Sequence, residues 1–170
     1  FLLRRQRQMC IRDRYQQLSA DFSTPIKTKN GEDGNVVEME IPQVVTISGI
    51  LNSGISISEY HSGIAKHENL NQIEWITDRG TLRLNAMTSL EWSESGKDFE
   101  PVQVPENQTR DWMVEADFIQ AVRLASEGAS ESERPVSPDF AEGLKYMKKM
   151  AALHLSEKEQ RVVKLSEIYN

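Results

Sequence analysis

The chain has 170 residues, of which 38% are hydrophobic and 27% are charged, and its 20 basic and 26 acidic side chains give a formal net charge of −6. This length is enough for one domain with a proper core. A net negative chain has no broad basic field to attract nucleic acid or an anionic membrane surface, so we expect no direct nucleic-acid partner. Because no run of about 18 apolar residues occurs, we also expect no membrane-spanning segment.

The first 14 residues, FLLRRQRQMCIRDR, differ in composition from the rest of the chain, since they hold five arginines and its only cysteine. A basic arm for nucleic acid or lipid head groups would explain the arginines. A secretory signal would need an apolar core where polar residues stand. One back-translation of residues 4–14 resembles a transposase adapter used in preparing sequencing libraries. We therefore predict that residues 1–14 are a non-native, disordered scar and that the natural N-terminus lies upstream.

Residues 1–14 contribute five basic side chains and one acidic side chain, so the rest of the chain has 15 basic and 25 acidic side chains and a formal charge of −10. It also has no cysteine. We therefore expect neither disulfides nor thiol chemistry, and we expect a cytoplasmic location. We predict that residues 15–170 form one sheet domain.

Short alternating segments predict strands over much of residues 15–104. They cover 15–23, 36–41, 44–51, 55–60, 72–77 and 81–84, with weaker segments at 89–92 and 101–104. The polar residues 27–35 predict a turn, and Gly-bearing links at 52–54 and 78–80 predict two hairpins. Strands joined mainly by hairpins form antiparallel sheets.

After residue 105 the apolar residues recur at helical spacing. They predict a helix over 111–126, followed by a polar loop over 127–135. A second helix is predicted to begin with Ser137 as N-cap and Pro138 as its first residue. Its predicted apolar face comprises Phe140, Leu144, Met147, Met150 or Ala151, and His154, and a short strand is predicted at 162–165. We predict an α+β fold: an open, largely antiparallel sheet with two late helices covering one face.

The sequence has no motif for a nucleotide cradle or a metal site. GxGxxG after a strand, GxxxxGK[ST], HExxH and CxxC are all absent. We therefore predict no cofactor-binding residue and no metal ligand in this chain.

Tyr60, His61 and Trp75 are the candidate substrate-binding residues. Tyr60 and His61 end a predicted strand whose alternation places Tyr60 with two serines on one face and His61 on the other. The polar face could bind a polyhydroxylated ligand, meet another subunit or be solvated. Trp75, like Trp92, could stack on a sugar ring or pack in the core. His154 is expected to be a packed or half-exposed helix residue.

Four segments in the same order resemble the C-terminal domain of the Gfo/Idh/MocA oxidoreductases. They are IPQVVTISGILNSGISISEYHSG, NQIEWITDRGTLRL, DWMVEADFIQAVR and PDFAEGLKYMKKMAALHLSEKEQRVVKL, and they cover nearly all of residues 18–165. The most similar branch includes the fungal galactose-regulon repressor. This sequence departs from the branch pattern at Pro42-Gln43-Val44, which lacks an Asp, and at Glu74-Trp75, where the pair is reversed.

The resemblance implies a two-domain parent protein. An N-terminal Rossmann domain would bind NAD or NADP and carry the catalytic Lys of a Glu-Lys-Pro motif, and a catalytic His would precede the first strand of the sheet domain. All of these would lie upstream of Tyr15, so no catalytic residue is predicted here and residues 15–170 alone should be inactive.

The resemblance also implies a substrate and an assembly. The parent would act on a sugar, inositol or related polyol and form a homo-oligomer through one face of the sheet. The alternative is a non-catalytic, dinucleotide-binding transcriptional regulator like the galactose repressor, which would act through protein partners. An unrelated α+β binding module is a third reading.

Overall fold

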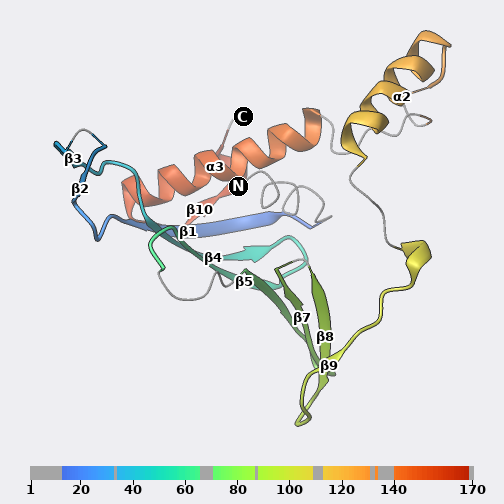
Figure 1. Cartoon of the computed structure of the whole chain (residues 1–170), viewed down its shortest axis with the longest axis horizontal. Coiled ribbons are helices and arrows are strands. Elements are labelled where there is room, and N and C mark those ends of the chain that lie inside the picture. Colours follow the sequence, from blue (N-terminus) through green and yellow to red (C-terminus); the bar gives the residue numbers. More distant parts are fainter. Residues whose placement is uncertain are drawn as a thin grey trace. The chain divides into compact units, whose positions relative to one another are not determined.

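A computed structural model describes residues 13–32, 34–65, 71–86, 88–108, 113–130, 133 and 140–168 (Figure 1). The chain divides into two compact units. Unit 1 contains residues 1–64 and 136–170, and unit 2 contains residues 65–135. Of the predicted scar, Asp13 and Arg14 fall within the described residues and residues 1–12 lie outside them.

Unit 1 is built on a four-stranded antiparallel sheet with strand order β10-β1-β4-β5. The strands are β1 (Tyr15–Ser23), β4 (Val44–Leu51), β5 (Ser56–Ser62) and β10 (Val163–Lys164). A separate hairpin joins β2 (Thr28–Asn30) to β3 (Val36–Glu38), where a polar turn was predicted for residues 27–35. The short 3-10 helix η3 (Leu165–Glu167) follows β10.

Helix α3 (Phe140–Glu159) lies along β1 and covers one face of this sheet (Figure 1). The buried core joins Leu18 and Ile47 of the sheet to Ala152 and Leu153 of the helix and to Val163 of β10. Alanine on the helix allows a close approach to the strands, because its side chain is small.

Side chains from the end of α3 also bond the backbone of β1 beyond its short pairing with β10. The Ala20 N–H donates to Ser156 Oγ at 3.0 Å, and the Phe22 N–H donates to Glu157 Oε2 at 3.1 Å. These bonds satisfy amides that a free sheet edge would expose.

Tyr15 is positioned by an irregularity in β1. The register of β1 against β4 shifts between Tyr15 and Gln17, as at a β-bulge, and a bulge re-aims a side chain. Gly49 makes room for the ring: a Cβ at Gly49 would lie 2.7 Å from the Tyr15 ring and 2.6 Å from the carbonyl oxygen of Gln17. The sequence thus fixes the Tyr15 ring against β4.

Unit 2 contains a second four-stranded antiparallel sheet, with the strands in chain order. They are β6 (Gln72–Ile76), β7 (Gly80–Asn85), β8 (Ser89–Glu94) and β9 (Glu100–Pro101). The 3-10 helix η1 (Glu106–Gln108) and helix α2 (Val114–Ser126) follow. The register places Trp75, Leu82 and Trp92 side by side on one face of this sheet.

The predicted α+β fold, with open antiparallel sheets and two late helices, is confirmed. The predicted apolar face of the second helix is wrong over its first half. Phe140 is 99% exposed, and Leu144, Met147 and His154 are exposed as well, although the His154 ring meets Phe22 edge to face at 5.3 Å. The residues that α3 buries are Lys149, Ala152, Leu153 and Ser156, about half a turn around the helix from Phe140.

Candidate functional site

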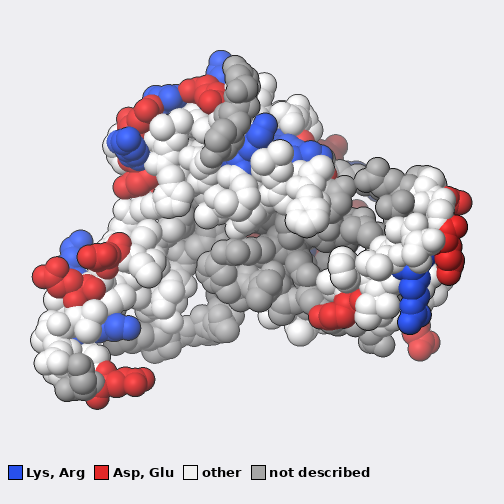
Figure 2. Space-filling view, turned by 90° about the horizontal axis from the view of Figure 1, so that it is seen from above, with Lys and Arg blue, Asp and Glu red and all other residues white. Residues whose placement is uncertain are grey.

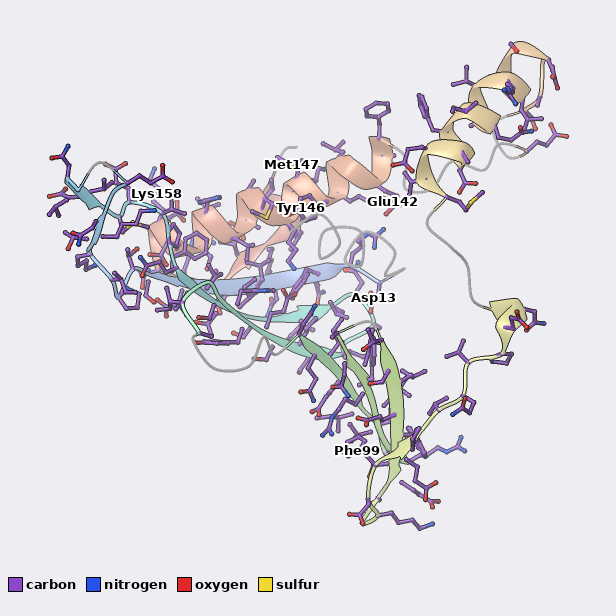
Figure 3. The ribbon with its side chains drawn as sticks, viewed as in Figure 1. Asp13, Phe99, Glu142, Tyr146, Met147 and Lys158 are labelled. Atoms are coloured by element: carbon purple, nitrogen blue, oxygen red, sulfur yellow. The ribbon has the colours of Figure 1, made fainter. Side chains whose placement is uncertain are left out.

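A cavity of about 610 Å³ lies within unit 1, in the size range of small-molecule sites. Its wall is formed by the N-terminal half of α3, the start of β1, the end of β4, the middle of β5 and the segment from β10 into η3. Figure 3 labels Asp13, just before β1, and Glu142 and Tyr146 on α3, and all three line the cavity. The wall is thus assembled from segments that are far apart in the sequence.

Glu59 on β5 is the centre of a hydrogen-bonded cluster at this cavity. Lys149 Nζ donates to Glu59 Oε1 at 2.8 Å, the Tyr15 hydroxyl donates to the same oxygen, and His61 Nε2 lies 3.0 Å from Glu59 Oε2. The Lys149 ammonium also lies over the Tyr15 ring, 4.7 Å from its centroid. Because the side chains of Glu59 and Lys149 are only 14% and 11% exposed, this ion pair is largely shielded from water.

The cluster keeps its central carboxylate ionised. Burial by itself would raise the pKa of Glu59, but hydrogen bonds from His61, Lys149 and Tyr15 and the charge of Lys149 outweigh burial and lower that pKa to about 2. Burial, together with the adjacent Glu59 carboxylate, raises the pKa of the Tyr15 hydroxyl. At neutral pH the site therefore presents a fixed carboxylate, a cation and a protonated phenol.

The strand register explains why these groups meet. Glu59 is paired with Ile47, and Ile47 points into the core beneath α3. Residues two apart on a strand share a face, so His61 lies on the same side as Glu59. Lys149 lies on the buried side of α3, one turn before Ala152 and Leu153.

Tyr60 and His61, two of the predicted substrate residues, lie on opposite faces of β5, and the third, Trp75, belongs to unit 2. Tyr60 is 68% exposed on the face of β5 away from α3, whereas His61 lies on the α3 face. Trp75 lies on β6 in unit 2 and is half exposed. His61 is therefore the one that joins the Glu59 cluster.

Tyr15, Glu59, Lys149 and Tyr146 were not among the predicted site residues. A signal for two of them was present in the sequence. Glu59 follows two isoleucines, Ile55 and Ile57, on one face of a strand, and Lys149 precedes an apolar run of a helix, residues 150–153. A charge on an apolar face predicts a buried partner, but the sequence does not say which residue the partner is.

Other structural features bear on partners. Both acidic and basic side chains show on the surface of the described residues in Figure 2. No helix among the described residues is long and apolar enough to cross a membrane. The same residues hold no group of three or more His, Cys, Asp or Glu side chains arranged to bind a metal ion.

Comparison with known proteins gives a match in structure. No family model and no curated protein matches the sequence. Levoglucosan dehydrogenase, in a complex with NADH and L-sorbose, is similar with a TM-score of 0.68 and 18% identity, over 89% of this chain and 45% of that chain. An oxidoreductase domain protein from Kribbella flavida gives a TM-score of 0.66 and 16% identity, over 90% and 45% of the two chains.

A super-repressor mutant of Gal80p from Saccharomyces cerevisiae gives a TM-score of 0.71 and 15% identity, over 96% of this chain and 48% of that chain. This chain thus spans less than half the length of the proteins it matches. Its fold is that of one domain of the Gfo/Idh/MocA oxidoreductases and of Gal80p.

Proposed function

We propose that this chain is the C-terminal, substrate-binding and oligomerisation domain of an NAD(P)-dependent oxidoreductase acting on a sugar, inositol or related polyol. The observation that carries the proposal is the fold. Nearly the whole chain superposes on less than half of each oxidoreductase, and one of those proteins is a levoglucosan dehydrogenase. The remaining half would be a nucleotide-binding domain upstream of Tyr15.

The cofactor would supply the hydride acceptor. This chain has no Gly-rich phosphate loop, so NAD(P) and the catalytic Lys and His would belong to the upstream half. The part assigned to this chain is the cavity beside Glu59. Its ionised carboxylate and the two tyrosine rings form a wall that suits a polyol, since carboxylates accept hydrogen bonds from hydroxyls and aromatic faces pack against sugar rings.

A homo-oligomer is proposed to form through the face of the unit 1 sheet that α3 leaves uncovered. Ser19 Oγ and Ser48 Oγ lie 2.9 Å apart on this face, and Tyr60 stands on the neighbouring strand. Thr46 and Ser58 are also exposed here. A regular face of short side chains with one exposed aromatic residue suits a self-complementary contact, because Tyr contributes a large area at low entropic cost.

The enzyme proposal is tested on the parent protein. The upstream coding sequence is recovered from the source DNA, and the whole protein is mixed with NAD or NADP and a panel of sugars and inositols. We expect NAD(P)H absorbance at 340 nm to appear with the parent and not with the 170-residue chain. A parent that binds NAD(P) but reduces it with no substrate on the panel would contradict the enzyme proposal.

A regulator of the Gal80p type is the second candidate. It is favoured by the match to Gal80p, which extends over 96% of this chain with a TM-score of 0.71. An upstream Glu-Lys-Pro motif would favour the enzyme. Dinucleotide binding without turnover, together with a missing motif, would favour the regulator.

A further inference from the structure

The charge of the cavity wall differs in sign from the charge of the chain. Five basic and three acidic side chains line the cavity, whereas the whole chain carries a net charge of −6. When Asp13 and Arg14, from the predicted scar, are set aside, four lysines face two glutamates. The excess of positive charge therefore does not depend on the first 14 residues.

Two of the four lysines are already neutralised. Lys149 pairs with Glu59 at 2.8 Å, and Lys145 pairs with Glu142 at 2.6 Å. The other two are Lys148 and Lys164, and neither forms an ion pair within 4.0 Å among the residues that the structure describes. The pKa of Glu167 is lowered chiefly by its hydrogen bond with Arg161, next by the hydrogen bond from the Lys164 backbone N–H, and least by the charge of Lys164.

The surroundings strengthen the effect of these two cations. Much of the remaining wall is apolar, and it includes Leu51, Ile57 and Leu165. Low-dielectric walls focus the field of a charge and raise the local concentration of oppositely charged ligands. Lysine binds phosphate and carboxylate groups as a compact point charge with three donors.

We propose that the cavity binds a sugar or polyol carrying an anionic group, a phosphate ester or a carboxylate, with Lys148 and Lys164 holding that group. The rings of Tyr15 and Tyr146 would pack against the carbon skeleton. This inference rests on the proposed function and narrows its substrate class from polyols in general to anionic ones.

The test is calorimetric titration of the 170-residue chain with glucose 6-phosphate, glucuronate, glucose and inorganic phosphate. At about 50 mM salt, we expect one of the two anionic sugars to bind about tenfold more tightly than glucose and than inorganic phosphate. The anionic sugar that binds more tightly identifies the group as a phosphate ester or a carboxylate. Raising the salt concentration tenfold should weaken its binding and leave glucose unaffected.

Three variants locate the binding group. Lys148→Ala and Lys164→Ala should each weaken the anionic sugar about fivefold to tenfold without changing the circular dichroism spectrum. Lys158→Ala is the matched control, since Lys158 is on the same helix and does not line the cavity.

The proposal is overturned if glucose or inorganic phosphate binds as tightly as the anionic sugars, if no sugar binds, or if Lys148→Ala and Lys164→Ala leave the binding of the anionic sugar unchanged. These failures are separate from a failure of the oxidoreductase proposal. Coenzyme reduction by the parent protein tests that proposal. A parent active only on neutral sugars would support the oxidoreductase proposal and contradict the anionic substrate class.

Discussion

Removing the charge of Glu59 should destabilise unit 1 strongly. In Glu59→Gln the buried Lys149 ammonium keeps its charge and loses its counterion, and breaking a buried pair in this way costs about 3–5 kcal/mol. The pKa of Glu59 gives a similar magnitude. A folded-state value of about 2, against the ordinary 4.5, corresponds to about 3 kcal/mol of unfolding free energy at neutral pH.

The assay is urea unfolding followed by circular dichroism at 222 nm, which reports on α3. Tryptophan fluorescence is unsuitable because all three tryptophans fall within the sequence of unit 2. The control is Glu159→Gln, whose exposed pair with Arg161 should contribute less than about 1 kcal/mol. The double variant Glu59→Gln, Lys149→Met removes both charges and should recover most of the lost stability.

The contribution of Glu59 to the free energy of unfolding depends on pH with a definite sign. Because the pKa of Glu59 is lowered by folding, the unfolded chain binds more protons between about pH 4.5 and pH 2. The stabilisation is complete above pH 4.5 and is lost as the pH falls toward 2. The Glu59→Gln variant should lack this part of the profile. If Glu59→Gln lowers the free energy of unfolding by less than about 0.5 kcal/mol at pH 7, the buried ion pair does not stabilise unit 1 as argued. A double variant as unstable as the single one would refute the argument as well.

Further substitutions test the packing of unit 1 and its self-association. Gly49→Ala should lower the free energy of unfolding by about 1–3 kcal/mol, because the added methyl group meets the Tyr15 ring and a carbonyl oxygen. An unchanged stability in urea would refute that close approach. Leu153→Ala should lower the free energy of unfolding by about 2–5 kcal/mol, whereas Leu144→Ala, at an exposed position, should change it by no more than about 0.5 kcal/mol. Equal losses would contradict the orientation of α3. Tyr60→Lys should weaken self-association in sedimentation velocity without changing stability, and a wild-type chain that stays monomeric at crystallisation concentrations would count against the oligomer face.

The strands and turns could be predicted because their signals are local. Alternating residues in β4 and β5, with Asn52-Ser53-Gly54 between them, specify a hairpin whichever other elements are present. The alternation also assigned Tyr60 and His61 to opposite faces correctly. Strand β2 was missed because Thr28–Asn30 carries no apolar residue, and its pairing depends on β3 alone.

The orientation of α3 could not be predicted. An apolar stripe predicts that one face of a helix is buried, but it does not identify the element that buries this face. The larger apolar residues Phe140, Leu144 and Met147 suggested the core face, but the sheet is met by Ala152 and Ser156, whose small size permits close approach. The Glu59–Lys149 pair joins positions 90 residues apart, a separation that no local pattern encodes. The residues that form the cavity wall were therefore beyond reach of the sequence alone.

The measurement that tests the central proposal most directly is to sequence the source DNA across the junction before Tyr15, with single reads long enough to span it. We expect the upstream frame to encode a strand followed by GxGxxG, then a Glu-Lys-Pro motif and a helix bearing a histidine, and not residues 1–14 as they stand. A genome that encodes FLLRRQRQMCIRDR at this place, or a start codon near Tyr15, would contradict the assignment of this chain to a dinucleotide-dependent oxidoreductase.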